Sequence, residues 1–239
     1  MVTKISGPKK AYLTQTISVN CTVRNKGDEA SGAYEVELYL SKYRSFKPST
    51  ARFMKKVAFA SGLAPGESKK VTIKVTLPNN WLDGLAGPIM AYRLYHFGIV
   101  VGASKEGSLN TVHIQRYKDN GDKTVSDFKT GLMWQKARGD TTWSWSKAIT
   151  YCTDLELGGH DDWVLPPIEV LTTIVDYTRG APACDPAFNC HYYGYWSSST
   201  SRYGPPVDVP WVVDFSRGEV STDSKSGDYN YVRCVRSGP

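Results

Sequence analysis

The 239-residue chain lacks several features that define familiar protein classes. No apolar run approaches the ~20 residues of a membrane-spanning helix, so we expect no direct membrane insertion. Paired CxxC motifs, a P-loop and a GxGxxG turn are also missing, so we expect no cofactor. After Met1 the sequence has no apolar segment of the secretion-signal type, so no export signal is visible. We expect either that such a signal was removed or that the protein has none.

The excess of positive over negative charge is confined to the first half of the chain. Residues 1–114 contain 16 Lys and Arg against 7 Asp and Glu, a net charge of +9. Residues 115–239 contain 13 against 16, a net charge of −3. A polyanion is one partner that such a basic half could take, but aromatic residues for base stacking are not interleaved with the basic ones. We therefore interpret the excess as solvated surface and expect no nucleic-acid partner.

Four of the five cysteines fall in the second half. An even set in one domain predicts two disulfides, for which three pairings exist. Cys184 and Cys190 flank a short loop and are the obvious local pair, which leaves Cys152 for Cys234. Such pairing predicts an oxidising, extracellular or surface-displayed location on a cell or virus particle. The odd residue, Cys21, is expected to be a small buried hydrophobic side chain.

The first half has the pattern of a β-protein. Apolar and polar residues alternate with a period of two in three segments, 16–23, 34–40 and 71–77. Turn residues separate them at 25–27 and 64–66. We therefore predict that residues 1–114 form an all-β, immunoglobulin-like sandwich.

Several turn and core segments of this half match a known family. They are VRNKG at 23–27, YLS at 39–41, LAPG at 63–66 and LP at 77–78. These segments resemble the CARDB family of bacterial and archaeal adhesion-type immunoglobulin-like modules. The resemblance covers about the first hundred residues and implies a spacer or presenting module.

The second half, residues 115–239, mixes helices and strands. Apolar residues recur at helical spacing between Trp143 and Leu155, with Thr142 or Ser144 as the expected cap. A second short helix is expected after Pro166 and Pro167, with one apolar face formed by Ile168, Leu171, Ile174 and Val175. Short strands are predicted at 195–198, 211–215 and 231–235. This half is therefore predicted to be α+β.

Four groups of segments in the second half occur in one family in the same order. They are 124–136 (TVSDFKTGLMWQK), 159–166 (GHDDWVLP) with 169–171 (EVL), 195–200 (YWSSST), and 211–215 (WVVDF) with 231–236 (YVRCVR). Together they resemble the Lcl C-terminal domain family, which is named for a collagen-like bacterial adhesin. This chain departs from the usual pattern at Val164, where Arg is common, and at Pro167, where Thr is common.

The resemblance implies a C-type-lectin-like domain of the fold group that also contains the formylglycine-generating enzyme. In that fold group a disulfide commonly ties the first helix to the last strand. Cys152 and Cys234 match those two positions.

Two clusters could indicate catalysis. Cys190 precedes His191, and Cys–His pairs serve as nucleophile and base in many enzymes. Disulfide formation with Cys184 would consume that thiol, and a formylglycine-generating activity needs free redox cysteines. The segment from His160 to Asp162 is interpreted as a turn rather than a metal or acid–base site. We predict that the protein is not an enzyme.

Calcium is considered at Asp119, Asn120, Asp122 and Asp127, whose side chains supply oxygen ligands. The glutamate that ends an EF-hand loop is missing, so a solvated β-turn is the preferred interpretation. We predict no metal site.

The residues after Cys184 have the composition of a recognition surface. Tyrosine supplies rigid amphipathic area, and small polar residues supply adaptable hydrogen bonds. Trp196 and Trp211 are assigned to the core, whereas Tyr193, Tyr203 and Tyr229 are expected to be exposed. The predicted ligand-binding residues are Tyr193, Tyr195, Ser199, Ser201, Arg202, Tyr203, Asp208, Asp214, Arg217, Asp228, Tyr229 and Asn230. The expected partner is a protein or glycan on another surface.

Four functions are weighed. The leading one is a binder, and its sequence could be diversified by a retroelement, because variable proteins of that kind use C-type-lectin folds. Adenine-directed change of Asn codons cannot yield Lys, Glu, Gln, Met or Trp, and residues 197–210 contain none of these. A glycan-binding adhesin of fixed specificity is the alternative, although the net charge of −3 argues against sulfated glycans there. A formylglycine-generating type of enzyme ranks third, and a structural spacer is the remaining possibility.

Overall fold

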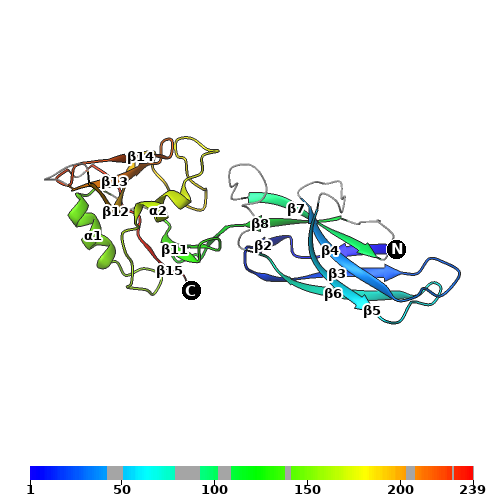
Figure 1. Cartoon of the computed structure of the whole chain (residues 1–239). Coiled ribbons are helices and arrows are strands. Elements are labelled where there is room, and N and C mark those ends of the chain that lie inside the picture. The colour runs from blue at the N-terminus through cyan, green and yellow to red at the C-terminus, as the bar shows by residue number, and fades with distance from the viewer. Residues whose placement is uncertain are drawn as a thin grey trace. The chain divides into compact units, whose positions relative to one another are not determined.

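The structure is a computed structural model that describes residues 1–41, 51–78, 92–101, 109–137, 141–202, 208–227 and 229–238 (Figure 1). The described residues as far as Gln115 form one compact unit, and those from Arg116 onward form a second. Each unit has its own sheets and its own core. Both units are rich in β-structure, as the sequence predicts, and the described helices all belong to the second.

The first unit consists of two sheets. One has the strand order β1-β3-β6 and the other the order β2-β8-β7-β4-β5. Neighbouring strands are antiparallel except for β2 and β8, which are parallel. Their bounds are β1 Val2–Ser6, β2 Lys10–Tyr12, β3 Thr16–Arg24, β4 Tyr34–Ser41, β5 Arg52–Phe59, β6 Ser68–Thr76, β7 Tyr92–Val101 and β8 Leu109–Gln115.

The period-two pattern explains why these segments are strands with one buried face. In β3, Ile17, Val19, Cys21 and Val23 are buried, while the residues between them are exposed or half-buried. Burial of a Val or Ile side chain stabilises the fold by about 1.5–3 kcal/mol, so the alternation specifies which face points inward. Cys21 is a free, buried cysteine, as predicted, and burial raises the pKa of its thiol to about 11.

The second unit combines two further sheets with short helices. The strand orders are β15-β11-β10-β9 and β12-β13-β14. The bounds are β9 Tyr117–Asp119, β10 Thr124–Asp127, β11 Leu132–Gln135, α1 Trp145–Thr153, α2 Ile168–Leu171, the 3-10 helix Thr172–Ile174, β12 Gly194–Arg202, β13 Asp208–Asp214, β14 Glu219–Thr222 and β15 Val235–Ser237. None of the described helices is long and apolar enough to cross a bilayer.

Some element boundaries differ from the predicted ones. Helix α1 begins at Trp145, with Ser144 as its N-cap residue but without a side-chain capping hydrogen bond. The predicted strand 231–235 is mostly irregular, because Tyr231 makes only a single bridge to Tyr195 and β15 starts at Val235. Hydrogen bonding to a neighbouring strand, rather than apolar content, decides where a strand is formed.

The core of the second unit lies on both sides of its central strands. Tyr195 and its cross-strand partner Val213 belong to one hydrophobic cluster, and the next pair, Trp196 and Val212, belongs to another. Helix α1 contributes Ala148 and Cys152 to the second cluster. Because both faces of β12 are covered, consecutive residues of this strand are buried, and its polar–apolar alternation is lost.

Both predicted disulfides are confirmed. Cys152 of α1 is bonded to Cys234, which immediately precedes β15, and Cys184 is bonded to Cys190. The first bridge closes 82 residues of sequence and lies inside the core, where both cysteines are fully buried. The second encloses the loop that leads towards β12.

Candidate functional site

Four aromatic side chains meet at the surface of the second unit, just before β12 and beside it. They are His191, Tyr192, Tyr193 and Tyr231, and together they are called the aromatic cluster. The rings of His191 and Tyr231 are stacked, with centroids 5.1 Å apart and planes 9° apart. The Tyr192 and Tyr193 rings lie 4.7 Å apart, and the His191 and Tyr193 rings 6.0 Å apart. Tyr192 and Tyr193 are 51% and 49% exposed, so the cluster presents ring surface to solvent.

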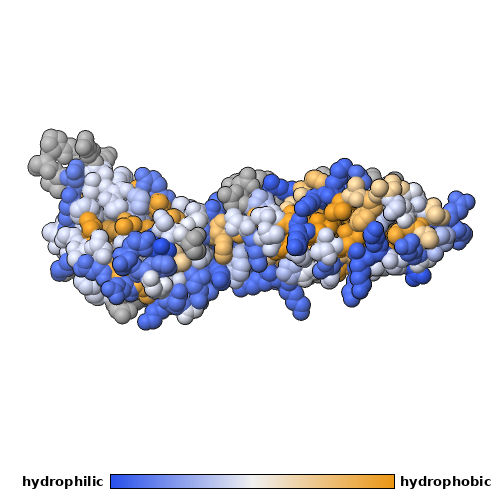
Figure 2. All heavy atoms as spheres, turned by 90° about the horizontal axis from the view of Figure 1, so that it is seen from below, coloured by the Kyte–Doolittle hydropathy of each residue, from blue (hydrophilic) through white to orange (hydrophobic). Residues whose placement is uncertain are grey.

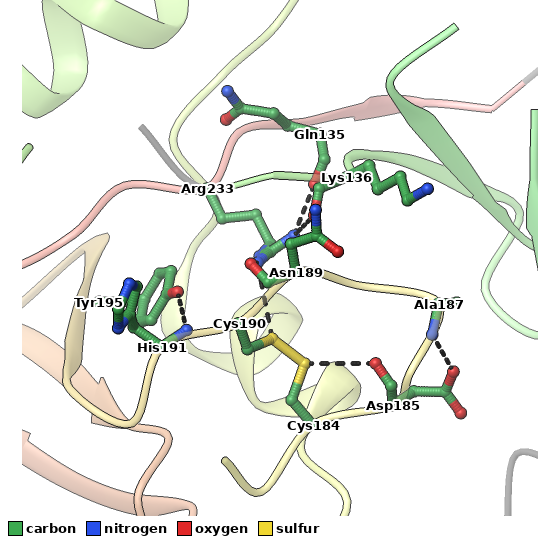
Figure 3. The surroundings of a disulfide bond; sticks show 10 residues. All are labelled: Gln135, Lys136, Cys184, Asp185, Ala187, Asn189, Cys190, His191, Tyr195 and Arg233. Atoms are coloured by element: carbon green, nitrogen blue, oxygen red, sulfur yellow. Dashed lines mark hydrogen bonds between the residues drawn. A yellow bond between two sulfur atoms is a disulfide. The ribbon is translucent and has the colours of Figure 1, made fainter. Parts of the chain in front are cut away.

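A disulfide and a hydrogen bond attach the start of this cluster, at His191, to the rest of the domain (Figure 3). The Cys184–Cys190 disulfide anchors the residue that precedes His191. The backbone N–H of His191 donates to the Tyr195 hydroxyl at 2.9 Å, and Tyr195 is fully buried. The segment that carries the exposed rings is therefore attached to the core at two consecutive residues.

Arg233 also contacts this loop, at Asn189 and Cys190 (Figure 3). This arginine is fully buried. Its Nη1 donates to the carbonyl oxygens of Gln135 at 2.7 Å and Lys136 at 2.6 Å. Its Nη2 donates to the Asn189 carbonyl at 2.9 Å and lies 3.5 Å from Cys190 Sγ. One planar side chain thus joins the end of β11 to the disulfide loop.

Aromatic rings complete the surroundings of this buried charge. The Arg233 guanidinium lies 5.1 Å from the Phe188 ring centroid and 5.7 Å from that of Tyr195. Carbonyl dipoles and ring faces can stabilise a buried cation by charge-assisted hydrogen bonds and cation–π attraction. In the sequence, Arg233 belongs to a family motif, but no role was predicted for it. Its neighbours in the sequence could have indicated that it is buried, because Arg233 lies between Val232 and the disulfide-bonded Cys234.

The Tyr193 hydroxyl stays in its neutral form at physiological pH, because its pKa is raised. The hydrogen bond with Tyr192 raises the pKa of Tyr193, and the negative charge of ionised Tyr192 and Tyr231 would raise it further. A neutral hydroxyl can donate as well as accept, so it suits polar groups of either kind in a ligand.

The predicted ligand-binding residues differ in how far their side chains are exposed to solvent. Four of them are exposed: Tyr193, Asp208, Arg217 and Tyr229, and Tyr229 reaches 68%. Ser199 and Asp214 are half-buried and accept hydrogen bonds from the backbone N–H groups of Ile168 and Ser216, respectively. Tyr203, Asp228 and the side chain of Arg202 lie outside the described residues. Trp196 is in the core as predicted, and Trp211 is half-buried.

Three of the predicted residues are buried, which corrects their assignment to an exposed surface. Tyr195 is 0% exposed and packs its ring edge against Phe215. Ser201 is 8% exposed and is paired with β13. Asn230 is 5% exposed, donates to Asp223 at 2.8 Å, and its carbonyl accepts from Trp143 N–H. These side chains are oriented towards the interior by strand pairing and loop contacts.

The acidic side chains considered for calcium are engaged with neighbouring groups. Asp119 pairs with Lys136 and accepts from Gly121 N–H, and the Lys136 hydrogen bond lowers its pKa. The pKa of Asp122 is lowered by a hydrogen bond from the Thr124 hydroxyl. Across the described ranges, no group of three His, Cys, Asp or Glu residues could hold a metal ion.

Asp127 forms a buried ion pair with Arg116. Arg116 Nε donates to Asp127 Oδ1 at 2.8 Å, and Nη2 donates to Oδ2 at 2.5 Å. The side chains are 4% and 0% exposed. In the turn predicted at 160–162, Asp162 pairs with Arg236, and the Trp163 indole donates to the carbonyls of Leu157 and His160. These acids therefore stabilise local structure.

Hydrophobic residues on the face shown in Figure 2 gather mainly on the first unit. On that face the second unit is largely hydrophilic, with smaller hydrophobic patches (Figure 2). That face of the second unit offers no broad apolar surface, in contrast to the local concentration of rings in the aromatic cluster.

The comparisons with known families agree with this division. Residues 123–236 match the Lcl C-terminal domain family. Residues 1–85 match the CARDB family. Both resemblances inferred from the sequence motifs are thereby confirmed. The two family matches suggest a surface or ligand-binding protein, and the region that matches the Lcl C-terminal domain family carries the aromatic cluster.

No curated protein matches the chain. Solved structures show a partial likeness. A beta-glucosidase from Listeria innocua is 23% identical over 46% of this chain and 15% of its own, with a TM-score of 0.33. The CARDB domain of a Pyrococcus furiosus protein, in complex with di-metal ions, is 15% identical over 46% of this chain and 82% of its own, with a TM-score of 0.30. The chain thus spans about 15% of the length of the Listeria enzyme that it matches.

Proposed function

We propose that the Lcl C-terminal domain of this protein is a non-enzymatic binding domain that is displayed outside the cell or on a virus particle. It binds a protein or another surface ligand through the aromatic cluster and the exposed residues around it. The observation that carries this proposal is the contact between four aromatic rings on a support that a disulfide and Arg233 hold in place.

Preorganisation makes such a surface suitable for binding. Ordering a side chain in an interface costs about 0.5–1.5 kcal/mol, and rings that already contact one another have less freedom to lose. Tyrosine is also enriched among the few residues that dominate binding energy at protein interfaces. The half-exposed rings of Tyr192 and Tyr193 therefore serve as anchors, and exposed polar residues near them supply specificity.

The state of the cysteines supports a non-enzymatic role. All four cysteines of this domain are in disulfides, and the fifth, Cys21, is buried in the first unit. His191 follows Cys190, but its ring is stacked on Tyr231, and the Cys190 sulfur is bonded to Cys184. The pair therefore has no free thiol to act as a nucleophile. Two disulfides in one small domain also support the extracellular location.

Binding arrays with two tyrosine variants test the proposal. The full chain is labelled and applied to a glycan array and to an array of cell-surface proteins. We expect the wild type to bind a reproducible set of array features. The double variant Tyr192→Ala with Tyr193→Ala should bind the same features with an affinity lower by about tenfold or more, because loss of anchor residues has that effect. The Tm should change little, because both side chains are about half exposed.

Tyr177→Ala is the matched control, because Tyr177 is 65% exposed and belongs to the same domain but not to the aromatic cluster. Equal binding by the wild type, the double variant and the control would refute the proposal. Features that are mainly saccharides would favour the glycan-binding adhesin.

Retroelement diversification of residues 197–210 stays a prediction. Ser197 is fully buried, and its hydroxyl donates to the Trp211 carbonyl at 2.8 Å, so a larger residue there would disturb the core. Ser198 is exposed and could vary freely. Sequencing the 3′ end of the gene in the source population should therefore show adenine-position changes at Ser198 but not at Ser197.

A further inference from the structure

The outer face of the sheet β1-β3-β6 in the first unit carries rows of lysine, serine, threonine and asparagine. On β6, the outward residues Lys70, Thr72 and Lys74 alternate with buried Val and Ile. In register, Thr22 of β3 lies between Lys4 of β1 and Lys70 of β6. The two lysine backbones are therefore about 10 Å apart, twice the spacing of neighbouring strands.

The cations of this face are free to meet a ligand. Lys4, Lys70 and Lys74 are all exposed. Within the described part of the chain, none of the three forms an ion pair. A fourth ammonium adds to the positive charge, because Lys55 Nζ donates to the Lys74 carbonyl at 2.9 Å.

The acidic residues that the structure describes in this unit lie outside the three strands of this face. Glu35 and Glu37 are on β4 of the other sheet, where Glu35 pairs with Lys56. Glu67 caps a turn, since its carboxylate accepts from Ala64 N–H. No Asp or Glu belongs to β1, β3 or β6, which are described in full. The charged side chains of these three strands are therefore all basic, and their positive potential raises the local concentration of anions.

A shallow hollow of about 310 Å³ lies between the lysines. Its polar lining consists of Lys4, Ser6, Asn20, Thr22, Lys70 and Thr72. Asn20 already accepts from the Thr72 hydroxyl at 2.7 Å, so the lining is an ordered array of polar groups. Hydroxyl and amide groups flanked by two ammonium groups complement a ligand that bears both hydroxyl and anionic substituents.

We propose that this face binds an acidic polysaccharide, with Lys4, Lys70 and Lys74 as the residues that meet its sulfate or carboxylate groups. A polysaccharide is favoured over a nucleic acid because the described strands of the face expose no aromatic ring on which a base could stack. The inference concerns the first unit and is independent of the ligand of the Lcl C-terminal domain.

Dextran sulfate and dextran test the proposal, because they share a backbone and differ in charge. The full chain should bind dextran sulfate and not dextran. Lys4→Gln, Lys70→Gln and Lys74→Gln combined should weaken binding by about tenfold, since each exposed ionic contact contributes a factor of a few. The salt dependence of the remaining binding should be shallower, because fewer counterions are released.

Lys9→Gln, Lys10→Gln and Lys56→Gln combined is the matched control. It removes the same charge, but Lys10 and Lys56 are on strands of the other sheet and Lys9 directly precedes one of them. We expect it to bind dextran sulfate like the wild type. Equal loss in both triple variants would overturn the proposal, because net charge alone would then explain binding. Displacement of dextran sulfate by single-stranded DNA at equal charge concentration would overturn the choice of a polysaccharide.

Discussion

Replacement of Arg233 by methionine tests whether this arginine supports the site. The guanidinium donates to three carbonyl oxygens and lies beside the Cys190 sulfur in a fully buried position. Methionine fills similar space but leaves those carbonyls without their donor. A buried polar group that loses its partner costs about 1–3 kcal/mol, and some of the carbonyls can rotate towards other donors. We expect Arg233→Met to lower the free energy of unfolding by about 3–5 kcal/mol.

Urea unfolding followed by tryptophan fluorescence is the assay, because six of the seven tryptophans lie in residues 115–239. Arg217→Met is the control, since Arg217 is exposed and should change the free energy of unfolding by less than about 0.5 kcal/mol. Hydrogen exchange should become faster at residues 189–193 in Arg233→Met. If Arg233→Met lowered the free energy of unfolding by less than about 1 kcal/mol, the reasoning would be refuted, because the three carbonyl oxygens would then need no donor.

Two further substitutions test buried positions. Burial and the charge of Asp176 raise the pKa of Asp185, so its ionised form destabilises the fold at pH values above its unfolded pKa. Asp185→Asn should therefore raise the free energy of unfolding at pH 7, and urea titrations at falling pH should show the gain vanish below the pKa of an aspartate in an unfolded chain, about 3.9. Gly194→Ala should lower the free energy of unfolding by about 1–3 kcal/mol, because the new Cβ would lie 1.9 Å from Asn230 Oδ1. Gly32→Ala is the control, because a Cβ added at Gly32 would have no atom within 4 Å. An equal loss of unfolding free energy in Gly32→Ala would contradict the steric explanation.

The strands of the first unit could be read from alternation alone. The predicted segments 16–23, 34–40 and 71–77 correspond to β3, β4 and β6. One face of each strand is buried and the other is in water, so the sequence repeats with the period of the strand. The signal is weaker in β12, where Tyr195, Trp196 and Ser197 are buried in succession because core lies on both faces.

The candidate site was predictable only in outline. Composition pointed to tyrosines after Cys184, and Tyr193 and Tyr229 are exposed as expected. Tyr192, an exposed member of the aromatic cluster, was not among the predicted ligand-binding residues, whereas Tyr195 was, and it is buried. Composition cannot distinguish neighbouring tyrosines of one segment from one another. Only the packing of each ring decides which of them is exposed to solvent.

The sequence by itself predicted the family resemblance of each half and both disulfide pairs, because these depend on residue type, spacing and loop length. The tertiary structure decided which tyrosines form a surface, how backbone carbonyls and aromatic rings surround Arg233, and where the lysines of β1 and β6 come together. Those properties arise from contacts between residues far apart in the chain, as between Arg233 and Gln135 or Lys4 and Thr22. Local sequence patterns do not contain that information, because strand pairing and core packing establish it only when the whole domain folds.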